Sequence, residues 1–117
     1  MLARAAPCAA NWFGDRQTGP SLLRYGSEEQ KQRYIPKLAS GEWIGSWALI
    51  EPESGSTAGG TNAREVREGD CWEINGGKTS TTNGKVADLY VVLAVTIGAA
   101  SSHGMAAYLV ETAPPGF

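Results

Sequence analysis

The hydrophobic pattern of this chain changes from a helical to a strand-like spacing at Gly41. Before this glycine, Tyr34 and Leu38 lie four residues apart, which places both on one face of a helix. After it, short apolar runs alternate with segments rich in glycine, serine and asparagine, a pattern typical of strands joined by turns. Helices followed by antiparallel strands make α+β the expected fold class.

The helical part of the chain contains three candidate segments. Leu2–Phe13 is rich in alanine and predicts one short helix, and Pro20–Tyr25 predicts a second. The third segment has the clearest boundaries. Ser27 and Gln30 have the spacing of a capping box at its start, and Gly41 ends it.

Five strands are expected after Gly41, and two of them flank Gly69-Asp70, which is a hairpin signal. One of the five is apolar almost throughout, as expected of a strand that is buried on both faces. The expected strands are Ile44–Ile50, Ala63–Glu68, Cys71–Ile74, Leu89–Val95 and Ala106–Val110.

Size and composition exclude several classes of function. A chain of 117 residues is one domain by size, and a net charge of −2 gives no reason to expect nucleic acid or an anionic membrane as a partner. The longest apolar stretch, Leu89–Val95, is far shorter than the ~20 residues of a membrane-spanning helix. Cys8 and Cys71 are too few for a disulfide framework, so a reducing compartment is expected.

Two polar loops carry the candidate chemistry. The first loop is Glu51–Gly60 and the second is Asn75–Gly84, and both are rich in small residues. Such residues let a backbone approach a ligand closely, and their N–H and O–H groups donate to anionic or carbonyl oxygens. The loops therefore suit a cofactor with a pyrophosphate and a polar ring edge, and ordinary turns are the alternative interpretation.

Other sites are excluded by what these segments lack. Gly55 and Gly60 have the spacing of the two P-loop glycines, but Thr61 occupies the position that requires a lysine. The one histidine, His103, lies among serine and glycine and predicts a turn. A metal site needs more histidine or cysteine than this chain contains.

Four blocks along the chain carry a resemblance to a known family. They are GSEEQKQRYIPKLASGEWIGSWALIEPESGS, NGGKTSTTNG, ADLYVVLAVT and MAAYLVETAPPGF. In this order they closely resemble the acyl-CoA dehydrogenase family, from about Gly19 to Phe117. The resemblance implies the end of an N-terminal helical domain over residues 1–41 and an incomplete middle domain over residues 42–117. That middle domain is expected to be an antiparallel β-barrel, truncated in this chain.

The resemblance also implies an activity. Members of the family are flavoproteins that desaturate an acyl-CoA thioester between its α and β carbons, with FAD as hydride acceptor. The electron acceptor is an electron-transfer flavoprotein or oxygen, and the full-length protein is expected to be a homo-oligomer in a bacterial cytoplasm or the mitochondrial matrix. The catalytic base is a glutamate of the family's C-terminal domain. No acidic residue here is therefore expected to be catalytic, and this chain alone is expected to be inactive.

Matching the family's motifs by position assigns the cofactor site. Backbone groups of Ala48 and Leu49 would face the flavin pyrimidine, and Thr82 would lie near flavin N5. Ser56 would contact both FAD and the acyl-CoA substrate. The complete implied set of cofactor-binding residues is Trp47, Ala48, Leu49, Ile50, Glu51, Ser56, Ser80, Thr81 and Thr82.

Several positions depart from the family's pattern. Ile50 replaces a threonine that donates to the flavin, Ser80 replaces an aromatic residue that packs against its ring, and Thr81 replaces an apolar residue. In the first loop, Glu53 replaces a glycine and Thr57 replaces an aspartate. A lost hydroxyl donor and a lost ring contact cost about 1 kcal/mol each, which weakens flavin binding by roughly ten- to a hundredfold.

These departures keep two alternatives open. The first is a non-catalytic binding or assembly module that kept the domain and lost the chemistry. The second is an acyl-CoA oxidase or flavin monooxygenase of the same fold, which uses oxygen as acceptor.

Overall fold

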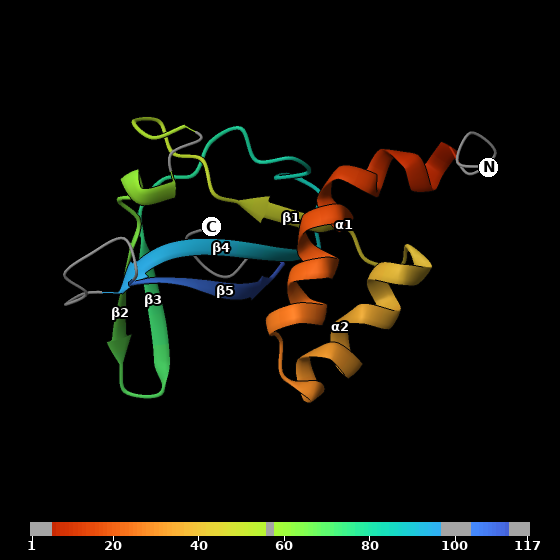
Figure 1. Cartoon of the computed structure of the whole chain (residues 1–117), viewed down its shortest axis with the longest axis horizontal. Coiled ribbons are helices and arrows are strands. Elements are labelled where there is room, and N and C mark those ends of the chain that lie inside the picture. Colours follow the sequence, from red (N-terminus) through yellow and green to blue (C-terminus); the bar gives the residue numbers. More distant parts are fainter. Residues whose placement is uncertain (1–5, 56–57, 97–103, 113–117) are drawn as a thin grey trace.

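The computed structural model describes residues 6–55, 58–96 and 104–112. Within them two helices precede a five-stranded sheet, so the expected α+β class is confirmed (Figure 1). The helices are α1 (Ala6–Tyr25) and α2 (Glu28–Ser40), and a short 3-10 turn, η2, covers Ala58–Gly60. The strands are β1 (Gly45–Ala48), β2 (Arg64–Glu68), β3 (Cys71–Asn75), β4 (Leu89–Thr96) and β5 (Met105–Glu111).

Helix α1 is one continuous helix, so the expectation of two short helices is wrong. Pro20 lies inside it, where a proline removes one backbone donor and usually interrupts the helix. Thr18 and Leu22, on either side of this proline, are 0% and 3% exposed. Burial against the rest of the protein therefore outweighs the local helix-breaking tendency of the proline.

Helix α2 begins and ends as its sequence predicts. The Gln30 N–H donates to Ser27 Oγ over 3.2 Å, and the Ser27 N–H donates to Gln30 Oε1 over 2.9 Å, which confirms the capping box. Gly41 follows the helix with a φ of 76°, a left-handed conformation that favours glycine.

Strand β4 is the centre of the sheet. β5 pairs with it antiparallel along Leu89–Val95, which leaves the other edge of β4 to β1 and β2. β1 pairs with Leu89–Val92 and β2 with Val95–Thr96, and both run parallel to β4. The expectation of antiparallel strands throughout is therefore wrong for these two pairings, and the described sheet is mixed and not closed. The hydrophobic spacing identified the strands but contains no information on which strand pairs with which.

The hairpin formed by β2 and β3 crosses β4 and β5 at a steep angle (Figure 1). Its turn contains Gly69 with a φ of 61°, as expected from the Gly-Asp signal. Val66 and Trp72 on this hairpin are 39% and 51% exposed. The hairpin therefore presents apolar side chains to solvent.

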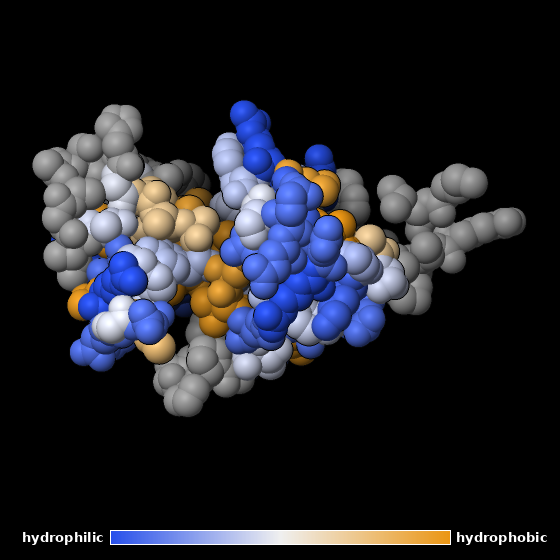
Figure 2. Space-filling model, turned by 90° about the horizontal axis from the view of Figure 1, so that it is seen from below, coloured by the Kyte–Doolittle hydropathy of each residue, from blue (hydrophilic) through white to orange (hydrophobic). Residues whose placement is uncertain are grey.

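The two faces of β4 carry separate apolar clusters. The cluster that faces the helices contains Leu22, Tyr34, Leu38 and Leu89. The cluster on the opposite face contains Ala48, Ala87, Tyr90 and Val92. The expectation that this strand is buried on both faces is thus confirmed. Figure 2 shows polar residues over the outer surface of the helices and apolar residues in the recess between the helices and the hairpin.

We expect the isolated chain to self-associate. Among the described strands, β5 pairs only with β4 and β3 only with β2, so each has an unpaired edge that can accept another strand. Ala107→Lys places a charge on the exposed part of β5 and should shift the chain toward monomer. Size-exclusion chromatography with light scattering at rising concentration measures this, and Ala39→Lys on α2 is the control. A compact monomer at every concentration would contradict the expectation.

Candidate functional site

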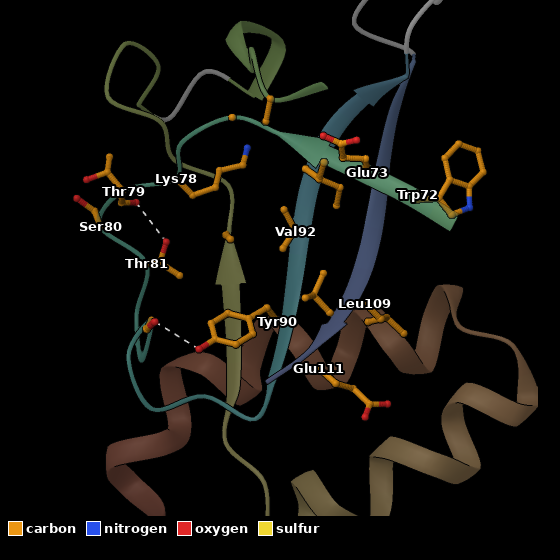
Figure 3. Close-up of a pocket in the computed structure, with 16 residues that line it drawn as sticks. Trp72, Glu73, Lys78, Thr79, Ser80, Thr81, Tyr90, Val92, Leu109 and Glu111 are labelled. Atoms are coloured by element: carbon orange, nitrogen blue, oxygen red, sulfur yellow. Dashed lines mark hydrogen bonds between the residues drawn. The ribbon is translucent and has the colours of Figure 1, made fainter. Parts of the chain in front are cut away.

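The candidate site is a hollow of about 920 Å³ on the face of β4 that points away from the helices. Lys78, Thr79, Ser80 and Thr81 border it on one side, and side chains of the sheet form its base (Figure 3). The sheet residues include Ala48, Tyr90 and Val92. The hollow thus has an apolar base and a polar rim formed by the second loop.

The two polar loops lie side by side at the edge of this hollow. The Thr79 N–H donates to the Ile50 carbonyl over 2.8 Å. Lys78 Nζ donates to the Leu49 carbonyl over 3.2 Å and to Glu51 Oε1 over 2.8 Å. Segments that are 27 to 29 residues apart in the sequence are therefore joined by three hydrogen bonds.

Glu51 lies at a junction on one edge of β4. There the pairing with β1 ends at Val92 and the pairing with β2 begins at Val95. The Glu51 carboxylate accepts the Asn62 N–H on Oε2 over 2.6 Å and the Ala63 N–H on Oε1 over 2.9 Å. The Ala63 carbonyl in turn accepts the Val95 N–H of β4 over 2.7 Å. The carboxylate of Glu51 therefore satisfies backbone donors that have no strand partner at this junction.

The environment of Glu51 lowers the pKa of its carboxyl group from the ordinary value of 4.5. Burial, the largest single influence, acts to raise this pKa, because only 3% of the residue is exposed. The hydrogen bond from Lys78 and those from the Asn62 and Ala63 N–H groups together outweigh burial. Glu51 is therefore ionised and paired at neutral pH.

The backbone of the second loop adopts an uncommon conformation. Ser80 and Asn83 have φ angles of 51° and 62°, in the left-handed region that costs most residues about 1–2 kcal/mol. Asn83 Nδ2 donates to the Gly45 carbonyl over 3.3 Å, and Ser46 Oγ donates to the Thr82 carbonyl over 2.7 Å. Two hydrogen bonds to β1 thus hold the loop in this shape.

Helix α1 supports the same strand. Thr18 Oγ1 donates to the Ser46 carbonyl over 3.0 Å, and both residues are fully buried. Ser46 therefore connects α1 to the second loop, since its carbonyl binds Thr18 and its hydroxyl binds Thr82.

The structure brings together most of the residues that the sequence predicts for the site. Ala48, Ser80 and Thr81 line the hollow, and Leu49, Ile50 and Glu51 make the contacts between the loops.

Three of the predicted residues lie elsewhere or outside the described part. Trp47 is half-buried in β1 and does not line the hollow, and neither does Thr82, which is exposed. Ser56, like Thr57 and His103, lies outside the described residues. The contact that each predicted residue makes with a cofactor stays a prediction.

Sequence reasoning missed Lys78 and Thr18 as parts of the site. Their partners are 27 and 28 residues away, so no local pattern reveals the contacts. One signal was present, because Lys78 is the single charged residue of the second loop. A lone charge among small polar residues is a candidate for a buried ion pair.

The described part of the chain offers neither a membrane-spanning helix nor a cluster of metal ligands. Across residues 6–55, 58–96 and 104–112, no helix is long and apolar enough to cross a membrane. The same residues contain no group of three or more histidine, cysteine or acidic side chains arranged to hold a metal ion.

Comparison with known proteins gives consistent matches. Residues 46–117 match the acyl-CoA dehydrogenase middle domain, and residues 1–42 match the acyl-CoA dehydrogenase N-terminal domain. An acyl-CoA dehydrogenase of Bacillus subtilis (strain 168) is 44% identical over 96 residues, which cover 82% of this chain and 25% of the relative.

Solved structures resemble the chain to a similar degree. An acyl-CoA dehydrogenase from Geobacillus kaustophilus superposes with a TM-score of 0.79 at 41% identity, covering 84% of this chain and 26% of that one. A glutaryl-CoA dehydrogenase from Mycobacterium smegmatis in complex with FADH2 gives a TM-score of 0.75 at 44% identity, with coverages of 83% and 24%. The chain thus spans about a quarter of the length of the relatives that it matches.

We expect the free energy of unfolding to fall as the pH drops below 4.5. A carboxyl whose pKa is lowered by folding stabilises the folded state above its unfolded pKa and loses this contribution as the pH falls through its folded pKa. Glu51→Gln should therefore lower the free energy of unfolding by about 2 kcal/mol at neutral pH. It should also make this free energy less dependent on pH below 4.5. Urea unfolding across this pH range measures both effects. Glu53→Gln, at an exposed carboxylate of the same loop, is the control, and equal pH profiles for the two variants would contradict the assignment.

Proposed function

The chain belongs to the acyl-CoA dehydrogenase family, and on this basis we propose that it forms the part of such an enzyme that holds FAD beside an acyl-CoA thioester. The proposed reaction is α,β-desaturation of the thioester, in which FAD supplies the hydride acceptor. The electrons would then pass to an electron-transfer flavoprotein or to oxygen.

The observation that carries this proposal is the contact between the two polar loops. The resemblance assigns the backbone of Ala48 and Leu49, just before the first loop, to the flavin pyrimidine and Thr82 of the second loop to the region of flavin N5. Those roles require the two segments to be adjacent. Hydrogen bonds from Lys78 and Thr79 to Leu49 and Ile50 make them adjacent at the edge of the hollow.

The residues around the hollow fit the chemistry of a flavin. Ala48 and Val92 offer an apolar surface for a planar ring, and the polar residues Ser80 and Thr81 line the rim, where a polar ring edge needs partners. The chain's own part in the reaction is then to orient the ring and to exclude water from one face of it.

Two carboxylates near the hollow, Glu51 and Glu111, are poorly suited to act as a catalytic base. Glu51 is buried and engaged by three donors, and its lowered pKa disfavours proton uptake. Glu111, also at the hollow, accepts from Tyr34 Oη over 2.7 Å and pairs with Arg33. We propose that the base belongs to another part of the enzyme, as the resemblance implies.

A non-catalytic module is the second candidate, and the substitutions in the loops favour it. Ile50 has no hydroxyl to donate, and Ser80 has no ring to pack against a flavin. A protein of this kind would keep the fold and the contact between the loops and would bind FAD weakly or not at all. Flavin affinity therefore decides between the two candidates.

Restoring the family's residues should tighten FAD binding. Ile50→Thr regains one hydrogen bond and Ser80→Trp regains ring contact, together about 2 kcal/mol or roughly thirtyfold in affinity. The measurement is flavin fluorescence quenching in a chimera in which this chain, including α2, replaces the matching quarter of the Geobacillus kaustophilus enzyme. Ser56→Ala should weaken both FAD and acyl-CoA binding, because one hydroxyl is proposed to serve both.

Substitutions distant from the hollow provide the control for this titration. Gln32→Thr with Ser40→Trp makes comparable changes at exposed positions of α2 and should leave FAD affinity unchanged. The residue assignments would be wrong if the double substitution at the loops left affinity unchanged and Ser56→Ala affected neither ligand.

A further inference from the structure

Glu51 and Lys78 connect three backbone segments that are distant in the sequence. Lys78 Nζ binds the Leu49 carbonyl and the Glu51 carboxylate, and that carboxylate also binds the N–H groups of Asn62 and Ala63. The Lys78 and Glu51 side chains are 12% and 3% exposed. Solvent therefore screens this pair little, and neither group can move without breaking several bonds together.

The pair determines how the backbone beside the hollow is oriented. The carbonyls of Leu49 and Ile50 both point to the second loop, where they accept from Lys78 and from the Thr79 N–H. The residues that follow, Ser80 and Thr81, line the hollow. Lys78 and Thr79 thus set the peptide planes at Leu49 and Ile50 and the distance of the second loop from the end of β1.

We propose that Glu51 and Lys78 are positioning residues that hold the two loops at the separation FAD binding requires, without contacting FAD themselves. This inference rests on the proposed function. It gives Glu51 a different role from the one implied by resemblance, which places it among the cofactor-binding residues. It also adds Lys78, which the resemblance did not assign.

For Lys78, this role is separable from general support of the fold. The apolar clusters on the two faces of β4 contain neither residue. Among the residues that the structure describes, the Lys78 side chain donates only to Leu49 and Glu51, both at the hollow's edge. Removing the amine should therefore loosen the loops while the helices and the sheet remain folded.

The test is titration of FAD into the full chain and its variants, followed by flavin fluorescence. Lys78→Met should weaken binding at least about tenfold, which corresponds to about 1.4 kcal/mol, and Lys78→Arg should recover most of the affinity. Glu51→Gln should also weaken binding. This direction is informative, because the substitution makes the chain less negative and a general electrostatic effect would tighten the binding of anionic FAD.

Two controls and a second ligand separate positioning from charge. Lys85→Met and Glu53→Gln make the same charge changes at exposed residues and should leave the Kd unchanged. Riboflavin has no phosphate, so the losses at Lys78 and Glu51 should persist with it, whereas an effect of charge on the pyrophosphate would disappear. Circular dichroism of each variant reports whether the helices and sheet are retained.

Each outcome decides the proposal. FAD affinities of Lys78→Met and Glu51→Gln equal to that of the unsubstituted chain would overturn the positioning role and leave the proposed function intact. Loss of the folded spectrum in both variants would overturn it too, since the pair would then support the whole fold. Failure of the unsubstituted chain to bind FAD or riboflavin would contradict the proposed function and, with it, this inference.

Discussion

Two strands share one edge of β4, and the buried carboxylate of Glu51 lies at the junction where one replaces the other. β1 pairs with β4 as far as Val92, and β2 joins from Val95 onward. The N–H groups that precede β2 have no strand partner there, and the carboxylate satisfies them. A buried carboxylate is itself costly unless a cation and further donors compensate its charge, and Lys78 provides the cation.

Because Lys78 comes from the second loop, the same requirement brings the two loops together at the hollow. The sheet junction and the candidate site are thus one network of hydrogen bonds. Helix α1 extends this network through Thr18 and Ser46 to the carbonyl of Thr82. This arrangement explains how short loops of small polar residues keep a defined shape, including the left-handed backbone of Ser80. It also explains why the hollow has a polar rim, formed by the second loop, and an apolar base.

Local features of this fold were predictable from the sequence, and features set by distant contacts were not. The capping box at Ser27 and the hairpin turn at Gly69 each depend on a few neighbouring residues, and both are present. Helix α1 passes through Pro20 because buried neighbours outweigh its local effect. The hydrophobic spacing does not indicate that β1 and β2 pair with β4 in parallel. For the site, resemblance supplied residues such as Ala48 and Thr81, whereas the ion pair of Lys78 required the structure.

A flavin-binding surface formed by the two joined loops is the proposal on which the others depend. Amide chemical shifts of the isotope-labelled chain, recorded by NMR as FAD is added, test it most directly. The largest changes are expected at Leu49, Ile50 and the amides of residues 79–82, whereas α2 and the turn at Gly69 should change little. Shifts confined to the helices or the hairpin, or no shifts at saturating FAD, would show that the loops do not bind flavin.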